Sequence, residues 1–387
     1  MKQTTILQVL PSLVSGGVET GTLDLAKALV KQGYRSLVVS SGGPLVKTLE
    51  AQGSQHIQLA VHSKNPFTIW LNSRKLARLI ERENVDLIHG RSRAPAWSAL
   101  WASKLTEIPF IATFHGVYGH QNALKRWYNS VMLRGQHSIA VSRFVAKHIE
   151  TIYPKYRHKI KLILRGIDIQ AFAAKQTQAL DELKDAWQLP DDKQIIILPG
   201  RLTRIKGHSI LIEALETLPQ RDFFCLFIGD EPGKEHYKQE LERMIADKGL
   251  LANIKFTGNC AKMASAYSLA DLVISASTKP ESFGRVACEA QLMQRIVIAT
   301  NHGGSQETIS PALRPLMCKP NDSTSMKQAI EQALALSQET RQKLGAEAAV
   351  YIRENFTLDK MCRDTIALYE LELCKRSSSE NVSRNLK

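Results

Sequence analysis

Short apolar runs that alternate with helix-compatible segments constrain this sequence more than any other feature. The first run, Thr5 to Leu10, is followed by a loop and by helical spacing from Val18 to Gln32. The same alternation continues through residues 36–168 and restarts at Gln194. Short β-branched runs between helical segments are typical of buried parallel strands. The sequence therefore predicts two Rossmann-like, doubly wound α/β domains facing a central cleft, with ligands at the carboxyl ends of the strands.

The predicted domain boundaries lie where this alternation stops. At 387 residues the chain is long enough for about two domains. An N-terminal domain is predicted over residues 1–168 and a C-terminal domain over residues 169–355. A C-terminal helix over residues 356–374 is expected to return to the N-terminal domain. The polar, Ser-rich end, residues 375–387, is expected to be disordered.

The composition indicates an anionic partner and a reducing compartment. Lys and Arg number 51 against 37 Asp and Glu, a formal charge of +14. Such a charge suits nucleic acid, a membrane surface or a phosphorylated substrate. The six cysteines are scattered without a C-x-x-C pair, which argues against a disulfide framework or a zinc site. The N-terminus lacks a signal-peptide pattern and no apolar stretch approaches about 18 residues, so a cytoplasmic protein is expected.

A stretch of residues 279–309 carries the pattern of half a nucleotide-binding unit. Its Pro-Glu-Ser-Phe-Gly loop precedes a helix-compatible segment from Arg285 to Met293, and a buried strand is expected over residues 295–300. The N-terminus of a helix suits a phosphate, because its first N–H groups are unpaired. Glu281 is then predicted to face a transferred sugar and Glu289 a ribose. The alternative is that two glutamates eight positions apart are an accident of a surface helix.

A Gly-rich turn follows the first predicted strand. Ser15, Gly16 and Gly17 precede a helix, where glycines let the backbone approach a phosphate. Residues 16–21 do not spell G-x-G-x-x-G, and the second strand ends in Ser40, where a dinucleotide-binding fold would carry an acidic residue. NAD binding is therefore disfavoured, and a simple strand-to-helix turn remains the alternative.

A second candidate phosphate site follows the first strand of the C-terminal half. Arg201 and Lys206 lie in the segment GRLTRIKG, residues 200–207. A planar guanidinium and a point-like ammonium at the end of one strand suit a diphosphate. The alternative is two solvated loop charges.

Taken together, these motifs resemble the retaining glycosyltransferases of family four, which have the GT-B fold. The resemblance spans nearly the whole chain, and its motifs are SGGVE (15–19), TFHG (113–116), GRLTRIKG (200–207), IGDEP (228–232), ADLVISAS (270–277), PESFGRVACEA (280–290) and GGSQE (303–307). Residues 91–100, RSRAPAWSAL, and residues 124–132, LKRWYNSVM, also resemble bacterial enzymes of lipopolysaccharide and envelope glycan synthesis.

The resemblance implies a role for each candidate residue. Arg201 and Lys206 would neutralise the diphosphate leaving group, to which Phe283 and Gly284 would present backbone N–H groups. Glu281 would hold hydroxyls of the transferred sugar, and Glu289 would bind the ribose. His115 would lie near the transferred sugar and the acceptor. Gly16 and Gly17 would close over the phosphates.

The same resemblance implies retention of anomeric configuration, with no metal and no cofactor. The donor would be a UDP-sugar or a GDP-sugar. One position departs from the family pattern: Arg165 stands before Gly166-Ile167-Asp168, where many relatives carry Asn. Arg165 is interpreted either as a contact to an anionic acceptor or as a choice of the subgroup.

A predicted helix over residues 122–134 points to a membrane surface. Its apolar residues fall on one face, with basic residues off that face; the apolar set is Leu124, Trp127, Tyr128, Val131 and Met132. This pattern is typical of an interfacial helix at an anionic lipid surface. An ordinary amphipathic helix packed on the sheet is the alternative.

The sequence thus predicts a glycosyltransferase on the inner face of the cytoplasmic membrane. It would move a sugar from a nucleotide donor to a lipid-linked or oligosaccharide acceptor, such as the lipopolysaccharide core. A sugar-nucleotide epimerase or a phosphorylase of the same fold is the enzymatic alternative. A nucleic-acid-binding protein is suggested by charge alone, since no recognition motif or stacking platform supports it.

Overall fold

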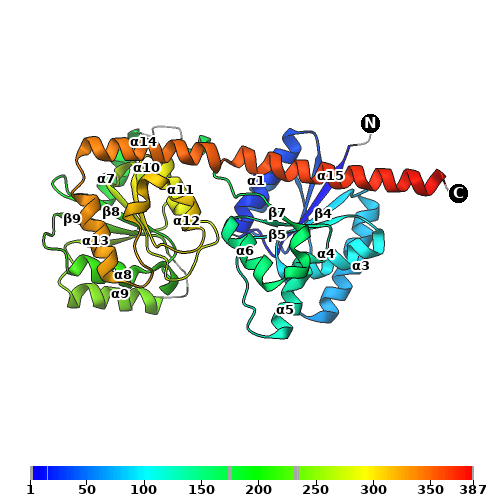
Figure 1. The fold of residues 1–387 in the computed structure, drawn as a ribbon, viewed down its shortest axis with the longest axis horizontal. Helices are drawn as coiled ribbons and strands as arrows, with labels where there is room; N and C mark the ends of the chain where they lie inside the picture. Colours follow the sequence, from blue (N-terminus) through cyan, green and yellow to red (C-terminus); the bar gives the residue numbers. More distant parts are fainter. Residues whose placement is uncertain (1–2, 15, 173–176, 231–232, 234, 386–387) are drawn as a thin grey trace. The chain divides into compact units, whose positions relative to one another are not determined.

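The structure, a computed structural model, describes residues 3–14, 16–172, 177–230, 233 and 235–385. It divides into two compact units (Figure 1). The first unit comprises residues 1–165 and 358–387, and the second unit residues 166–357. The division therefore falls three residues before the predicted boundary at residue 168.

The first unit is built on a seven-stranded sheet in which every pairing is parallel. The strand order is β3-β2-β1-β4-β5-β6-β7. The strands are β1 (Thr5–Val9), β2 (Arg35–Ser40), β3 (Gln55–Gln58), β4 (Leu87–Gly90), β5 (Phe110–Phe114), β6 (His137–Ala140) and β7 (Ile160–Leu162). The order reverses between β1 and β4, which is the topological switch point where doubly wound sheets bind ligands.

Helices cover both faces of this sheet. The helices of the unit are α1 (Gly17–Lys31), α2 (Val46–Ala51), α3 (Pro66–Arg82), α4 (Arg93–Thr106), α5 (Ala123–Asn129), α6 (Arg143–Ile152) and α15 (Leu358–Asn385), with 3-10 turns η1 (Ser130–Leu133) and η2 (Pro154–Lys159). Successive strand residues point to opposite faces. Ile6 of β1 packs with Leu29 of α1 and Tyr369 of α15, whereas Leu7 packs with the cluster of α3 and α4. Figure 1 shows α15 running beside α1.

The predicted helix over residues 122–134 is two elements, and its apolar residues do not share one environment. Helix α5 ends at Asn129 and η1 follows. Val131 and Met132 are fully buried in the core, whereas Leu124 is 73% exposed and Trp127 is 53% exposed. The prediction that residues 131–132 belong to a single interfacial face is therefore wrong. The chain changes from α5 to the 3-10 turn η1, which places these two side chains in the core.

The second unit repeats the same topology with five parallel strands in the order β10-β9-β8-β11-β12. The strands are β8 (Gln194–Pro199), β9 (Phe223–Ile228), β10 (Ile254–Gly258), β11 (Leu272–Ser275) and β12 (Ile296–Ala299). The helices are α7 (Thr177–Trp187), α8 (His208–Glu216), α9 (Glu235–Asp247), α10 (Met263–Leu269), α11 (Arg285–Leu292), α12 (Ser305–Thr308), α13 (Ser323–Leu334) and α14 (Gln338–Asn355), with 3-10 turns η3 (Gln170–Phe172), η4 (Arg204–Lys206) and η5 (Pro311–Leu316).

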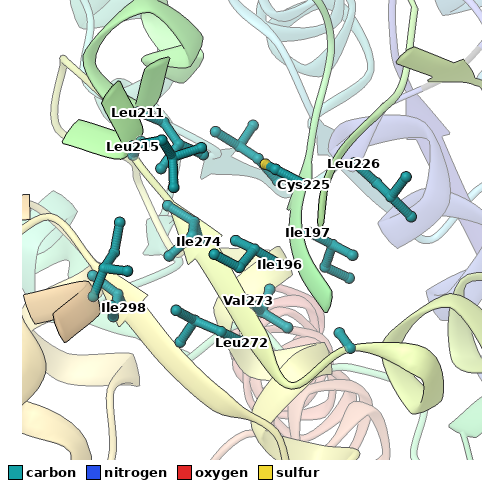
Figure 2. Packing of buried hydrophobic residues seen from close by; sticks show 14 of the residues in the cluster. Ile196, Ile197, Leu211, Leu215, Cys225, Leu226, Leu272, Val273, Ile274 and Ile298 are labelled. Carbon is teal, nitrogen blue, oxygen red and sulfur yellow. The ribbon is translucent and has the colours of Figure 1, made fainter. Parts of the chain in front are cut away.

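Both faces of the central strands β8 and β11 are buried in this unit. Figure 2 shows Ile196 and Ile197 of β8 beside Val273 and Ile274 of β11, all four without solvent exposure. Unbroken apolar runs are expected where helices cover both faces of a parallel sheet. The predicted helix over residues 285–293 and strand over residues 295–300 match α11 and β12 to within a residue at each end.

The end of the chain differs from the prediction. Helix α15 belongs to the first unit and extends to Asn385, so residues 375–385 are helical where disorder was expected. An i,i+3 ion pair of 2.7 Å from Lys375 to Glu372 supports the continuation beyond the packed part of the helix. Within the described residues, no helix combines the length and apolar character needed to cross a membrane.

Candidate functional site

Two loops of the second unit meet at its topological switch point. Strands β8 and β11 are parallel neighbours, and the strand order reverses between them. The loops that follow them, residues 200–207 and 276–284, therefore begin at the same edge of the sheet. The backbone N–H of Thr278 donates to the carbonyl of Ile205 at 2.8 Å and ties one loop to the other.

An ion pair joins the candidate residues of these loops. The Nζ of Lys206 lies 2.5 Å from Oε1 of Glu281, and the hydroxyl of Ser277 donates to the same oxygen. The side chains of Lys206 and Glu281 are 25% and 16% exposed. Burial raises the pKa of Glu281, but the ammonium of Lys206 and the hydrogen bonds from Lys206 and Ser277 outweigh it, so the pKa lies below its ordinary value. Glu281 is therefore an anion fixed in place at neutral pH.

Gly207 fixes the position of Lys206. Its φ is +74°, and a Cβ at this position would lie 2.0 Å from the carbonyl oxygen of Ala276. Any other residue would collide with the backbone after β11 and would also be strained in this conformation. The glycine thus allows the close contact of the two loops that brings Lys206 to Glu281.

Helix α11 begins where the sequence placed a phosphate. Gly284 is its N-cap residue and no side chain caps it. Phe283 is 5% exposed and packs edge-on against Phe356, with ring centroids 5.7 Å apart. The backbone N–H of Gly304 donates to the carbonyl of Glu281 at 2.7 Å, so the second Gly-rich turn supports the loop. The start of α11 is held rigidly, and its role toward a phosphate stays a prediction.

Glu289 is a buried residue rather than a solvated surface glutamate. Its side chain is 8% exposed. Arg285 donates to Oε1 from Nε at 2.5 Å, and the hydroxyl of Tyr267 donates to Oε2 at 2.9 Å. The pKa of Tyr267 lies well above its ordinary value, mainly because the phenol is buried and also because the charge of Glu289 is close. Both carboxylate oxygens thus accept hydrogen bonds within the protein, and the ribose role stays a prediction.

Arg201 and Lys206 line a pocket of about 580 Å³. Arg201 is exposed. Arg204 also lines this pocket; it donates to Glu240 at 2.8 Å, and its guanidinium lies 5.2 Å from the ring centre of Tyr237. The pocket therefore adjoins the Lys206–Glu281 pair, and two further cations of the same loop, Arg201 and Arg204, line it.

The Gly-rich turn of the first unit leads into α1. Gly16 is the N-cap residue, without a side-chain cap, and α1 begins at Gly17. The Nη2 of Arg165 donates to the carbonyl of Gly17 at 2.5 Å. Arg165 thus lies against the start of α1. Ser15 of this turn lies outside the described residues, as do residues 231–232 of the IGDEP motif.

Arg91 is a buried cation beneath the same helix. It is 4% exposed, and its Nη1 donates to Oε1 of Gln8 at 2.8 Å. Its Nη2 lies 3.1 Å from the place that a Cβ on Gly21 of α1 would occupy. Its Nε has no hydrogen-bond partner among the described residues. Burial lowers the pKa of Arg91, since a guanidinium is poorly solvated there.

His115 follows β5, and both ring nitrogens are shielded from solvent without a hydrogen-bond partner in the described chain. Burial lowers the pKa of His115 well below its ordinary value, and the cations Arg91 and Arg165 lower it further. By contrast, His89 on β4 is satisfied on both sides, by Tyr369 at 2.5 Å and Thr113 at 2.7 Å. His115 is therefore a neutral imidazole with its hydrogen-bonding capacity unused.

The sequence reasoning missed several residues that hold the candidate side chains. Ser277 bonds Glu281, and Tyr267 with Arg285 bonds Glu289. Three of the missed residues had a signal, because Ser277 ends the ADLVISAS motif, Arg91 begins RSRAPAWSAL, and Arg285 lies in PESFGRVACEA four positions before Glu289. For Tyr267 the sequence carried no signal, since its contact with the buried carboxylate depends on packing.

The described residues contain no evident metal-binding site. Within residues 3–14, 16–172, 177–230, 233 and 235–385, no three His, Cys, Asp or Glu side chains gather as a metal-binding group. The candidate sites carry lysine, arginine, a paired carboxylate and helix N-termini.

Comparisons with known proteins agree with this geometry. Residues 15–171 match the family model "Glycosyltransferase Family 4", and residues 180–350 match "Glycosyl transferases group 1". A crystal structure of a glycosyltransferase from Rickettsia africae ESF-5 is 39% identical, covers 97% of this chain and 100% of its own, and superposes with a TM-score of 0.89.

More distant structures share the fold. HepE of Anabaena, solved with UDP and glucose, is 21% identical with a TM-score of 0.81, over 95% of this chain and 100% of its own. WaaG, a glycosyltransferase involved in lipopolysaccharide biosynthesis, is 14% identical with a TM-score of 0.69, over 93% and 98%.

Two parallel-sheet α/β units of one topology define the GT-B class of fold. The family matches and the Rickettsia relative go further: the chain belongs to the family 4 glycosyltransferases, with a second half of the group 1 type. It is a glycosyltransferase, as the motifs of the sequence indicated.

Proposed function

We propose that this glycosyltransferase uses a nucleotide diphosphate sugar and retains the anomeric configuration. The observation that carries the proposal is the Lys206–Glu281 pair at the switch point of β8 and β11, beside the start of α11. A UDP-sugar donor is further supported by HepE, which has been solved with UDP-glucose.

In this proposal the second unit stabilises the leaving group. Lys206 and Arg201 place positive charge where the diphosphate departs, and the uncapped start of α11 adds backbone N–H groups of Phe283 and Gly284. Glu281, ionised and fixed by Ser277, accepts hydrogen bonds from hydroxyls of the transferred sugar. Glu289 contacts the ribose.

The first unit is assigned the remaining contacts. Gly16 and Gly17 at the start of α1 contact the phosphates, and His115 contacts the transferred sugar and the acceptor. His115 is suited to this because a neutral imidazole donates and accepts a hydrogen bond at once.

A panel of UDP-sugars and GDP-sugars tests the donor. Thermal shift identifies the nucleotide, and the anomeric form of the transferred product distinguishes retention from inversion. An epimerase would convert donor without acceptor and release no nucleoside diphosphate, so that outcome would replace the proposal. No stabilisation by any nucleotide sugar would contradict it.

Metal independence belongs to the same proposal, because Lys206 and Arg201 supply charge that a metal supplies elsewhere. Turnover is therefore expected to survive EDTA. Activity that disappears in EDTA and returns with magnesium or manganese would contradict this assignment.

We further propose a lipid-linked envelope glycan as acceptor and attachment to the inner face of the cytoplasmic membrane. Leu124 and Trp127 are exposed on α5, and the basic residues Lys125 and Arg126 lie beside them. WaaG, of the same fold, takes part in lipopolysaccharide biosynthesis. Aromatic and basic residues together suit an anionic lipid interface, where each cation adds about 1 kcal/mol.

Binding to anionic vesicles tests the attachment. It is expected to weaken as salt rises and to drop in the variant Lys125→Glu, Arg126→Glu. The matched control reverses two exposed lysines of the second unit, Lys184→Glu and Lys343→Glu, with the same change in net charge. Equal losses in both variants, or binding that ignores salt, would remove α5 as the attachment element.

A further inference from the structure

An open pocket of the first unit has no part in the donor contacts described above. Its volume is about 780 Å³. It lies between the loop after β3, the start of α4 and helix α5, with Lys64, Ser92 and Lys125 among its lining residues. These residues come from three separate elements of one compact unit.

The charges around this pocket all have one sign. Lys64, Arg93 and Lys125 line it together with His62, and no Asp or Glu is among the described residues of its wall. Helix α4 begins here, at an N-cap Ser92 whose side chain makes no capping hydrogen bond. Three cations and the positive end of a 14-residue helix therefore face the same space, which favours an anion.

Arg93 is held in place before any ligand binds. Its Nη1 donates to Oδ1 of Asn129 at 3.0 Å, and its guanidinium lies 4.1 Å from the ring centre of Tyr118. Asn129 in turn donates to the carbonyl of Gly119 at 2.8 Å. A guanidinium fixed by stacking and a hydrogen bond loses little entropy when it binds a phosphate.

Helix α5 also contributes aromatic side chains to the wall of the pocket. Trp127 is 53% exposed, and its ring is supported by Trp97 at 4.7 Å and by the guanidinium of Arg134 at 5.3 Å. The hydroxyl of Tyr128, also on this wall, is buried without a hydrogen-bond partner among the described residues. A rigid aromatic face with an unsatisfied hydroxyl beside it suits a sugar ring, which presents C–H groups on its face and hydroxyls at its edge.

We propose that this pocket binds a phosphorylated sugar of the acceptor, with the phosphate on Lys64, Arg93 and Lys125 and the sugar ring on Trp127. The inference rests on the proposed function, because it supplies the acceptor of that reaction. A phosphate carries nearly two negative charges and several acceptor oxygens, which matches cations that approach from three elements. An uncharged glycan would leave these cations unused.

Binding is tested without turnover, so that failure here is distinct from failure of the donor assignment. Among the five tryptophans, the indole N–H signal of Trp127 is identified by the variant Trp127→Phe. α-D-Glucose 1-phosphate is the probe, with glucose and inorganic phosphate as partial ligands. A saturable shift of the Trp127 signal is expected with glucose 1-phosphate, at lower concentration than with either partial ligand.

Charge reversal then locates the phosphate. Lys64→Glu and Lys125→Glu are each expected to weaken glucose 1-phosphate binding about tenfold or more, since a charge-assisted hydrogen bond is lost. Arg126→Glu is the matched control, because Arg126 is an exposed neighbour on α5 that does not line the pocket. UDP affinity should be unchanged in all three variants.

Three outcomes would overturn the proposal. The first is glucose that binds as well as glucose 1-phosphate. The second is a loss of binding in Arg126→Glu as large as that in Lys64→Glu. The third is a Trp127 signal that shifts with anionic vesicles alone and not with glucose 1-phosphate. The last would make the pocket part of the membrane contact. Unchanged UDP binding in any of these cases would leave the donor assignment standing.

Discussion

The two units share a strand order but treat charge at the switch point differently. At this point the second unit pairs its cation, Lys206, with Glu281 within 2.5 Å. The first unit buries Arg91 against the neutral Gln8 and keeps His115 uncharged nearby. The same topology therefore supports a fixed ion pair in one unit and, in the other, a buried cation that is hydrogen-bonded to a neutral amide. What a doubly wound sheet supplies is a place for chemistry, and the side chains after the strands decide what that chemistry is.

The largest effect in this comparison is expected from the Lys206–Glu281 ion pair of the second unit. Lys206→Ala and Glu281→Gln are each expected to lower turnover about a hundredfold or more, because in the proposed mechanism each removes a group that contacts the donor in the transition state. Lys248→Ala, which removes a comparable pair with Glu216 in the same unit, is the control. Steady-state rates with thermal shift as a check on folding provide the measurement. Near wild-type rates in both variants would contradict the assignment of Lys206 and Glu281 to the donor site.

The loop contact beneath that pair can be broken separately. Gly207→Ala is expected to lower the free energy of unfolding by about 2–3 kcal/mol, because its Cβ collides with Ala276 in a left-handed conformation. Gly33→Ala in the first unit is the matched control: its φ is +83°, yet no atom lies within 4 Å of the added Cβ. The control should lose about 1 kcal/mol. Equal losses in chemical denaturation would show that the contact between the loops does not matter.

Glu289 tests whether a buried carboxylate can still serve a ligand. Glu289→Ala is expected to weaken nucleoside diphosphate binding about tenfold, or roughly 1.4 kcal/mol. Tyr267→Phe removes one internal hydrogen bond but keeps the carboxylate, and should bind the nucleotide nearly as wild type does. Calorimetry that finds unchanged affinity in Glu289→Ala would make Glu289 purely structural.

The neutral imidazole of His115 in the first unit predicts a smaller effect, on how the stability of the fold depends on pH. His115 and His89 have lowered pKa values in the folded protein, so below about pH 6.5 the unfolded chain binds more protons than the folded one. Stability should therefore fall between pH 7 and pH 5, and His115→Gln should reduce that loss by a few degrees of Tm. The exposed His62→Gln is the control. The same loss of Tm in all three proteins would show that His115 is not responsible.

Much of the second unit was predictable because its signals are local. The Pro-Glu-Ser-Phe-Gly loop, α11 and β12 follow one another within residues 280–299, and each has its own pattern of turn, helical or β-branched residues. The burial of Glu289 was not predictable in this way, because Tyr267 reaches it from another helix.

In the first unit, local patterns misled where the chain changed direction. The apolar face predicted over residues 122–134 assumed one straight helix. The change to η1 at Ser130 turns Val131 and Met132 into the core and leaves Trp127 outside. The open pocket beside Trp127 was not predictable from local patterns either, since Lys64, Arg93 and Lys125 are distant in sequence and come from the loop after β3, the start of α4 and helix α5.

By itself the sequence determined the fold class, the order of the elements and the family of this glycosyltransferase. Strand and helix periods and glycine positions are properties of neighbouring residues, so they can be read without the fold. Only the tertiary structure decided which side chains each charged group contacts. Lys206 pairs with Glu281, Glu289 accepts a hydrogen bond from Tyr267, and Arg91 donates to the neutral Gln8. The physical reason is that a contact between side chains far apart in sequence depends on strand order and close packing, and neither is encoded in any local stretch of the chain.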